Sequence, residues 1–324
     1  MDSTVATGTE ENVWGGGNQP LGASYGKMMM WFFLVSDSLT FAGFLVSYGF
    51  MRFKFADSWP IADEVFTHVP FFHGNYPMYY VAFMTFILIM SSVTMVLAVD
   101  AGHRMMKKKV TLYMFLTVIG GLIFVGSQAW EWATFIGGDY GALETKGGRI
   151  LQFQYADTGE RAAIKDFSVT LPSERVNHER KNGLWFTEDK ALPSYSLTEV
   201  IEGVKANPNI LIRTEQLNEH GEKTVLSRDE TLKKLSDARL VVEGANLKHN
   251  EYGNRLFADL FFFITGFHGF HVSVGIILNI IIFFNVILGT YERRGHYEMV
   301  EKVGLYWHFV DLVWVFVFTF FYLV

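Results

Sequence analysis

Two ionisable residues near the C-terminal end of the chain lie inside a long apolar segment. His308 and Asp311 stand three positions apart in Leu305–Trp314, and residues 315–324 carry no charged side chain. Inserting such a group deep in a membrane costs about 2.5–3.5 kcal/mol. Because residues three apart share one helix face, the two side chains could offset this cost for each other. The pair is a candidate for chemistry, for metal binding or for locking helices together.

Two further histidines lie in an earlier apolar segment. His268 and His271 also share a helix face, and Gly266 and Gly269 permit a close neighbouring backbone. Paired membrane histidines raise the question of haem or metal ligation. Axial histidines usually approach a b-type haem from opposite sides, so two on one face cannot clamp it. Interhelical or headgroup hydrogen bonding is the favoured use, and a membrane haem or metal protein using His268, His271 and His308 is the alternative.

Two carboxyl groups complete the set of candidate residues. Asp37 lies in the middle of an apolar segment, where it is either a proton-linked carboxyl or a neutral one bonded to a neighbouring helix. Glu131 follows Gln128 and lies beside Trp130 and Trp132, which are typical of a membrane interface, so a half-solvated carboxyl is favoured. A proton-coupled transporter is a weaker reading, because no inverted repeat or broken helix is visible.

The composition divides the chain into two kinds of region. Half of the residues are hydrophobic, yet about 17 of the 27 Lys and Arg and about 19 of the 33 Asp and Glu lie in residues 137–256. This distribution is typical of a polytopic membrane protein with one large polar insertion. The absence of cysteine excludes disulfides and thiolate metal sites. The net charge of -6 suggests no nucleic-acid partner.

Five segments are long enough to cross a hydrocarbon core, which needs about 20 residues. They are continuous and show no strand-like alternation, so we expect helices. The predicted fold is an all-α polytopic membrane protein, a five-transmembrane-helix bundle with a small α+β insertion outside the membrane. Its expected parts are a tail (1–27), three helices (28–136), the insertion (137–256) and two helices (257–324). The predicted spans are Met28–Met51, Pro77–Val99, Val110–Ile136, Phe257–Gly289 and Val303–Val324.

Basic residues in the short loops predict the orientation. Residues 104–109 and 293–302 carry most of them, whereas the loop after the first span has only Arg52 and Lys54 against three acids. The positive-inside rule places the N-terminus in the cytoplasm and the C-terminus and the insertion outside. The tail, residues 1–27, is acidic and glycine-rich, contains no visible cleavable signal peptide, and is expected to be loosely ordered.

Local patterns predict some elements of the insertion. Ile150–Tyr155 and Ala162–Leu171 flank an Asp-Thr-Gly-Glu turn and are typical of a hairpin. Ser196–Val204 has a helical pattern. Ser227 begins a Ser-x-x-Glu capping box, which predicts a helix towards Leu240.

The strings in the last two apolar segments resemble subunit III of the haem-copper respiratory oxidases. Thr265–Val272 matches the family's Thr-Gly-Phe-His-Gly-x-His-Val, and Tyr306–Trp314 matches its Tyr-Trp-His-Phe-Val-Asp-x-Val-Trp. Glu301 falls seven positions before the histidine of the second string, as in the family, and His296 also fits.

The resemblance extends to the first three spans. Gln128–Glu131 is similar to the family's Gln-Ala-x-Glu, and Phe33–Phe44 is similar to its first-helix pattern. Neither the tail nor the insertion is covered. The resemblance implies that the polar and aromatic residues of the last two spans make helix-packing, subunit or lipid contacts: His268, His271, His296, Glu301, Trp307, His308, Asp311 and Trp314.

The resemblance implies a non-redox accessory subunit. In the family, subunit III packs against subunit I, which holds the haems and copper, and has subunit II as a further partner. No cofactor is then expected in this chain, but phospholipids are expected in a cleft between its helices. The family subunit supports proton uptake and protects the core during turnover, while electrons pass from cytochrome c, or from quinol in some branches, to oxygen. The implied location is a bacterial cytoplasmic membrane.

Three departures from the family pattern limit what carries over. Asp37 stands where the family has glutamate, which shortens the side chain by one methylene. Only five spans are present, unlike the seven-helix form, so part of the lipid cleft is absent or built elsewhere. The family's short connection between the third and fourth of these spans is here an extra domain, for which we expect an interface with cytochrome c or with an upstream complex.

Overall fold

Five long helices dominate the computed structural model of the chain. The structure describes residues 24–70, 76–171, 176–177, 193–218 and 222–323. Each long helix is apolar enough to cross a membrane by its length and composition. The five predicted spans are therefore confirmed as helices, each shifted by a few residues at its ends, whereas residues 1–23 of the predicted tail lie outside the described residues. The helices are α1 (Tyr25–Lys54), α3 (Tyr79–His103), α4 (Lys107–Gly137), α8 (Arg255–Ile287) and α10 (Glu298–Phe318), the last continued by a π-helical turn over Thr319–Leu323.

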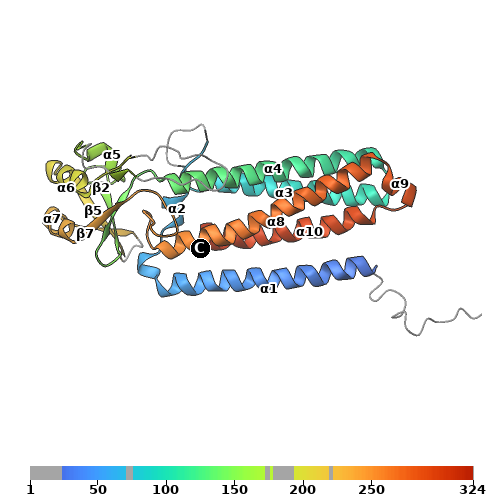
Figure 1. The fold of residues 1–324 in the computed structure, drawn as a ribbon, viewed down its shortest axis with the longest axis horizontal. Helices are drawn as coiled ribbons and strands as arrows, with labels where there is room; N and C mark the ends of the chain where they lie inside the picture. The colour runs from blue at the N-terminus through green and yellow to red at the C-terminus, as the bar shows by residue number, and fades with distance from the viewer. Residues whose placement is uncertain (1–23, 71–75, 172–175, 178–192, 219–221, 324) are drawn as a thin grey trace, which may run out of the picture.

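Consecutive helices of the bundle run in opposite directions. The far end of α1, the start of α3, the end of α4, the start of α8 and the C-terminus all lie at the end of the bundle that carries the insertion (Figure 1). The short loops, including α9 (Thr290–Arg294), lie at the opposite end. We call these the insertion end and the opposite end. This arrangement matches the predicted topology, in which the insertion and the C-terminus share one side of the membrane.

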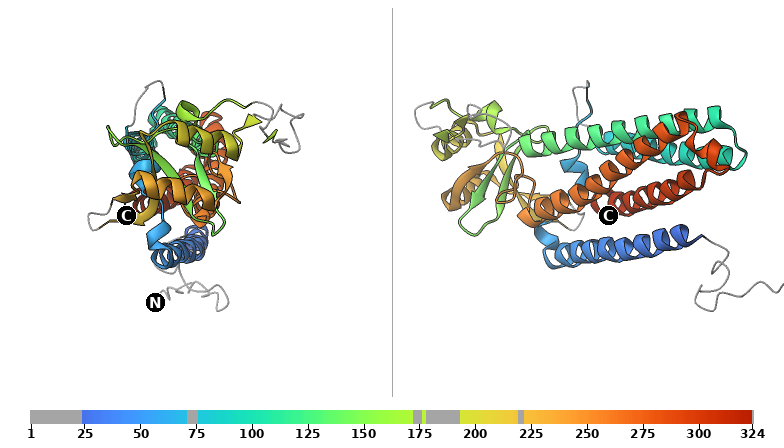
Figure 2. Two further views of the ribbon diagram at one scale, coloured as in Figure 1. Left: turned by 90° about the vertical axis from the view of Figure 1, so that its left-hand side faces the viewer. Right: turned by 45° about the vertical axis from the view of Figure 1, so that its right-hand side comes forward.

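Helix α1 is the least embedded of the five. Among the long helices it packs mainly against α10 and α8, and 17% of its most apolar stretch is buried, against 33–44% for the others. Figures 1 and 2 show it lying along the outside of the other four helices. Its outward face carries large apolar side chains, including Phe32, Leu39 and Phe50, which in a membrane must contact lipid or another subunit.

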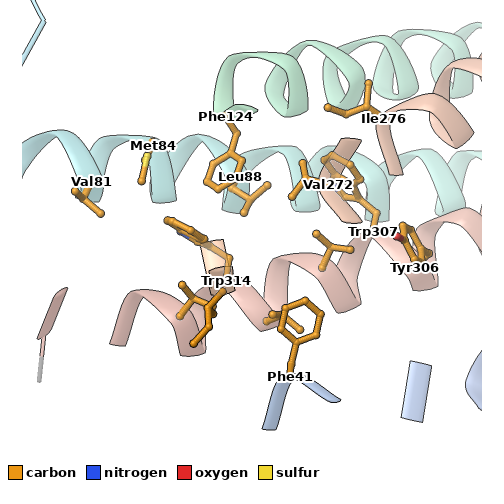
Figure 3. Packing of buried hydrophobic residues seen from close by; sticks show 14 of the residues in the cluster. Phe41, Val81, Met84, Leu88, Phe124, Val272, Ile276, Tyr306, Trp307 and Trp314 are labelled. Atoms are coloured by element: carbon orange, nitrogen blue, oxygen red, sulfur yellow. The ribbon is translucent and has the colours of Figure 1, made fainter. Parts of the chain in front are cut away.

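The core of the four inner helices is built largely from aromatic and long aliphatic side chains. Trp307, Trp314 and Phe124 are no more than 1% exposed, as are Met84 and Leu88 opposite them (Figure 3). The Phe124 and Trp314 rings meet edge to face with centroids 4.8 Å apart, a favoured geometry for aromatic pairs.

The insertion forms a five-stranded antiparallel sheet with its own apolar core. The sheet order is β6-β5-β2-β1-β7, and the core lies between the sheet and the short helices α5 and α6 (Figure 2). A two-residue ladder of β3 (Val176–Asn177) and β4 (Pro193–Ser194) lies apart from this sheet. Two very short helical segments, Ala56–Ser58 and α2 (Ala62–Val65), precede α3. The remaining elements are β1 (Ala142–Thr145), β2 (Ile150–Tyr155), α5 (Ile164–Phe167), α6 (Leu197–Ala206), β5 (Ile210–Leu217), β6 (Lys223–Val225), α7 (Arg228–Lys234) and β7 (Ala238–Val242).

The local predictions for the insertion are correct where side chains cap a helix and wrong where pairing is long-range. Ser196 and Ser227 both form complete capping boxes, so α6 and α7 begin where expected. Helix α7 ends early, because Ala238–Val242 leaves the helix to pair with β1. The predicted hairpin forms its turn and a single antiparallel bridge, Gln154 with Arg161, but no continuing second strand. Strand β2 pairs with β1 and β5 instead, and residues 164–167 are helical.

Glu251 ties the two ends of the insertion together at its junction with the bundle. Its carboxylate accepts from the backbone N–H groups of Asp139 and Tyr140, and also from those of Gly141 and Gly244, at 2.5–3.3 Å. Tyr252, the next residue, stacks on Phe135 of α4 with ring centroids 5.2 Å apart. The insertion is therefore fixed to the end of the bundle by buried contacts.

A second buried contact joins the sheet to the loop between α1 and α3. Glu64 in that loop accepts from Arg213 of β5 at 2.5 Å and lies 3.2 Å from the Lys223 ammonium of β6. Lys223 also donates to Gln152 of β2 at 2.9 Å. Arg161, above the same loop, donates to the Glu64 backbone carbonyl at 3.2 Å. The sheet face nearest the bundle is thus polar, and its charges are paired with the bundle's own loop.

Candidate functional site

Two tryptophans of α10 donate to hydroxyl groups of α3. The Trp307 Nε1–H donates to Ser91 Oγ at 3.1 Å, and the Trp314 Nε1–H donates to Thr85 Oγ1 at 2.9 Å. All four side chains are buried. A buried indole needs an acceptor for its N–H, and here each acceptor lies on the neighbouring antiparallel helix. We call this contact the α3–α10 seam.

The position of Trp307 depends on two glycines of other helices. A Cβ at Gly121 of α4 would lie 2.6 Å from the indole ring, and one at Gly275 of α8 would lie 3.0 Å from it. Larger residues at these positions would displace the ring. The α10 tryptophan therefore fills a space that three neighbouring helices leave for it.

His308 and Asp311 do not pair directly. In the part of the chain that the structure describes, no hydrogen bond or ion pair joins them. The His308 Nδ1 instead lies 2.7 Å from Ser92 Oγ of α3. The same hydroxyl lies close to the Asp311 carboxyl, whose Oδ1 is buried without a hydrogen-bond partner. The expected mutual pairing is thus replaced by a shared contact with Ser92, which extends the α3–α10 seam.

His268 connects α8 to α10. Its Nε2 lies 3.0 Å from the Val310 carbonyl oxygen, and its side chain is buried between the rings of Phe124 and Trp314. A carbonyl oxygen only accepts, so Nε2 must carry the hydrogen. The Nε2–H group is therefore occupied by the hydrogen bond that joins α8 to α10.

His271 connects α8 to the peripheral helix α1. Its Nδ1 lies 2.9 Å from the Phe267 carbonyl oxygen, so Nδ1 carries a hydrogen, and its Nε2 lies 3.2 Å from Asp37 Oδ2. The two groups are either an imidazolium with a carboxylate or a neutral ring with a neutral acid. Both forms have no net charge, which lowers the cost of burial. Both residues are candidates from their sequence positions, but their contact depends on the packing of α1 against α8.

Glu131 is buried, contrary to the favoured half-solvated position. It is 4% exposed, and its Oε2 accepts from the Gln128 amide at 2.6 Å and from the Tyr322 hydroxyl at 2.9 Å. Tyr322 belongs to the C-terminal π-helical turn, which folds over the end of α4. The error arose because Trp130 and Trp132 predicted an interface, while the C-terminal turn and the insertion cover this end of the helix.

Glu301 and His296 lie at the opposite end of the bundle. Glu301 forms an ion pair with Lys27 of α1 at 2.7 Å, both side chains being about a quarter exposed. His296, Glu301 and Lys27 line a polar cavity of about 320 Å³ between α1, α3 and the start of α10. The Glu301–Lys27 ion pair thus holds α1 at its first turn.

An apolar groove of about 570 Å³ runs between α1 and α10. Its lining is almost wholly hydrocarbon, and Ser38 and His308 are its polar members. Trp31 and Phe316 belong to its walls. Its position follows from the loose packing of α1 against the bundle.

The three candidate histidines face protein groups on different helices. Among the described residues, no group of three or more His, Cys, Asp or Glu side chains is arranged to hold a metal ion. His268 contacts a backbone carbonyl, His271 contacts Asp37, and His308 contacts Ser92. Through these polar contacts the histidines join α8 to α10 and α1, and α10 to α3.

Sequence reasoning missed the hydroxyl groups of α3, although a signal was available. Ser91, which accepts from Trp307, lies six residues after Thr85, which accepts from Trp314, and the two tryptophans are seven residues apart. Both spacings are close to two helical turns. Hydroxyl groups and indoles that recur at about two turns on two antiparallel apolar helices would have indicated the seam.

Comparison with known proteins finds similarity in the segment that contains α8 and α10. Residues 249–324 match the family model described as cytochrome c oxidase subunit III. A probable cytochrome c oxidase subunit 3 of Rickettsia conorii is 44% identical over 75 residues, which are 22% of this chain and 26% of the relative. The Synechocystis subunit 3 is 44% identical over 78 residues, 23% of this chain and 33% of the relative. The chain thus spans about a quarter to a third of the length of these relatives.

The five apolar helices and their buried polar seam define a multi-pass helical membrane protein. The matched segment contains both histidines of α8 and the whole of α10. Residues 249–324, which carry both strings of α8 and α10, are similar to subunit III of the cytochrome c oxidases.

Proposed function

We propose that this chain is a non-redox accessory subunit of a proton-pumping terminal oxidase that reduces oxygen with electrons from cytochrome c. Its role is to stabilise the catalytic subunit I, to hold phospholipid and to support proton uptake by the core. The haems and copper then belong to partner subunits. The membrane is the cytoplasmic membrane of a bacterium, with the N-terminus inside and the insertion and the C-terminus in the periplasm.

The observation that carries this proposal is the use made of the α10 motif. Trp307, His308 and Trp314 each contact a hydroxyl of α3, and Val310 accepts from His268 of α8. The family-like segment Tyr306–Trp314 therefore serves to pack α10 against α3 and α8. A chain whose histidines are engaged in this way supports a neighbouring redox subunit better than it binds haem itself.

The test is purification of the complete complex from its native membrane in mild detergent. We expect this chain to co-purify with subunits I and II and with haem-copper activity towards reduced cytochrome c. The isolated chain should have no Soret band and no stoichiometric metal. A Soret band in the isolated chain would favour the haem protein alternative, and activity with quinol alone would assign the donor differently.

The exposed apolar face of α1 and the Asp37–His271 pair bear on attachment to subunit I. Because α1 is held by few contacts within the chain, a partner helix would bury its outward face. We expect Asp311→Asn to weaken retention of this subunit, since the Ser92 contact is shared with His308. Normal retention and normal turnover would mean that Asp311 is dispensable.

A hydrophobic carbodiimide should modify Asp37 if it is neutral, and an unmodified peptide would favour the ion pair.

The groove between α1 and α10 is the proposed phospholipid site. A groove of about 570 Å³ with hydrocarbon walls suits acyl chains, because a buried CH₂ group contributes about 0.8 kcal/mol. Leu312→Ser on this wall should reduce the lipid retained after delipidation. Val93→Ser, on the exposed face of α3 outside the groove, is the matched control.

The insertion is proposed to contact cytochrome c or an upstream respiratory complex. Its charges are nearly balanced, so shape and apolar contacts rather than long-range steering should dominate. Gly138 and Gly244 are adjacent, since a Cβ on Gly138 would lie 2.5 Å from Gly244 Cα. Deleting residues 139–243 should leave the oxidase core assembled but weaken co-purification of the partner. Unchanged co-purification would contradict this role.

A further inference from the structure

One buried carboxylate oxygen in the bundle is left without a protein partner. Glu131 Oε2 accepts two hydrogen bonds, but Glu131 Oε1 and the nearby Gln128 Oε1 have none among the described residues. An unsatisfied buried oxygen costs about 1–3 kcal/mol. Both oxygens lie at the insertion end of α4, so a donor on that side is required.

A small cavity lies directly against Glu131. Its volume of about 10 Å³ is close to the minimum for a single water molecule. Glu131 and Thr134 of α4 line it together with Tyr80 of α3, Tyr252 of the insertion junction, and His68. These polar groups are enough to hold a water molecule, which needs two to four partners.

The cavity leads from the buried carboxyl to the aqueous end of the molecule. His68 lies in its wall and is 34% exposed, and its Nε2 forms an ion pair with Asp139, which is 37% exposed. A titratable pair in contact with solvent therefore lies across the cavity from Glu131. Tyr80 and Tyr252 are the other titratable groups in the wall, and Tyr322 donates to Glu131 from the C-terminal turn.

Packed aromatic residues separate Glu131 from the opposite end of the bundle. The ring of Trp314 lies 6.2 Å from that of Tyr322, and Phe124 packs edge to face on Trp314. Leu88 and Trp307 continue this layer towards the opposite end, all nearly fully buried (Figure 3).

We propose that this cavity holds one water molecule, which connects Glu131 to His68 and Asp139, and that Glu131 exchanges its proton only with the insertion side of the membrane. The proposal rests on the membrane-spanning role of the bundle in the proposed function. It assigns Glu131 to the side of the membrane that the proposed function places in the periplasm. Glu131 is then a proton-exchanging group with access from one side.

Infrared spectroscopy of the complete oxidase in vesicles tests this access. The complex is oriented with the insertion outside, as checked by protease cleavage. A carboxylic C=O band is assigned to Glu131 by its loss in Glu131→Gln or its shift in Glu131→Asp. Changing the external pH between about 5 and 9 should change this band immediately, with the lumen held at constant pH. A band that follows the lumen, or no pH-dependent carboxyl change, would overturn the proposal.

Variants of the wall separate the water path from general stability. Val81→Phe fills the cavity and His68→Leu removes the solvent-facing group, and both keep Glu131. We expect either change to slow exchange of the band by about tenfold, because proton transfer then requires local opening. Val93→Phe on the exposed face of α3 is the control. Unaltered exchange in both wall variants would contradict the path. Haem content and oxidase assembly are read separately, so failure of the subunit role is distinguishable.

Discussion

The helix bundle and the insertion bury polar groups in different ways. In the bundle, buried polar side chains mostly form single contacts between neutral groups, such as Trp314 with Thr85 or His268 with a carbonyl. At the insertion junction, full charges are buried in a network around Glu64. A bundle that must sit in lipid avoids net charge. The insertion faces water on its outer side and can bury charges that satisfy one another.

The electrostatics of the junction follow from this crowding. Burial raises the pKa of Glu64, but Lys223 and Arg213 outweigh it and hold that pKa below its usual value. Burial also lowers the pKa of Lys223 to about 8, although Glu64 acts in the opposite direction. In this network the neighbouring cations stabilise the charged form of Glu64, whereas burial destabilises the charged form of Lys223. We therefore expect substitutions at the insertion junction and in the bundle to change stability by different amounts.

The largest expected effect is loss of the Glu251 carboxylate. Glu251→Ala removes the acceptor of four backbone N–H groups and should destabilise the insertion by at least about 4 kcal/mol. Glu251→Gln keeps one acceptor oxygen and should cost less. Pulse proteolysis of the purified complex in increasing urea measures the midpoint at which the insertion becomes cleavable. Equal midpoints for wild type and Glu251→Ala would show that the junction does not depend on this side chain.

Removal of the Glu64 carboxylate comes next. Glu64→Ala leaves Arg213 and Lys223 buried without their counter-charge, which should cost about 3 kcal/mol or more. The double variant Glu64→Ala/Lys223→Met should recover part of this loss, because one buried charge is removed. The same urea series measures both. A double variant that is less stable than the sum of the single changes would contradict a Coulombic cause.

A change in the bundle should have a smaller effect. Trp314→Phe keeps an aromatic ring but removes the N–H that donates to Thr85. We expect a loss of about 1 kcal/mol for the hydrogen bond, in addition to the packing loss. A double-mutant cycle with Thr85→Val isolates the coupling, measured as the thermal midpoint of subunit release from the complex. A coupling indistinguishable from zero would mean that the seam is held by packing alone.

A further expected effect is a difference in pH dependence. Since burial holds the pKa of Lys223 at about 8, between this value and about pH 10.5 the unfolded chain binds a proton that the folded chain does not. Stability from this group therefore rises with pH across that window. Lys223→Met lacks this rise, so the urea midpoint of wild type minus that of the variant should increase from pH 7.5 to pH 10. Parallel curves would place the lysine pKa near its ordinary value.

The five long helices and their order could be predicted from the sequence alone. Apolar runs such as residues 257–289 must form helices in a membrane, because only a helix satisfies every backbone group within one segment. The capping boxes at Ser196 and Ser227 were equally local and equally readable. The two strings in α8 and α10 also indicated the family that residues 249–324 match. Each of these features depends on residues close together in the chain.

The partners of the polar side chains were decided only by the tertiary structure. His308 meets Ser92 rather than Asp311, and His271 meets Asp37 of a helix more than 200 residues earlier. Such contacts depend on how each helix is rotated about its axis, and aromatic volume and glycine gaps around Trp307 set that rotation. The sheet pairing of β2 with β5 is likewise long-range. Sequence alone determined which residues would be costly to bury, and the packing of distant segments determined how that cost is met.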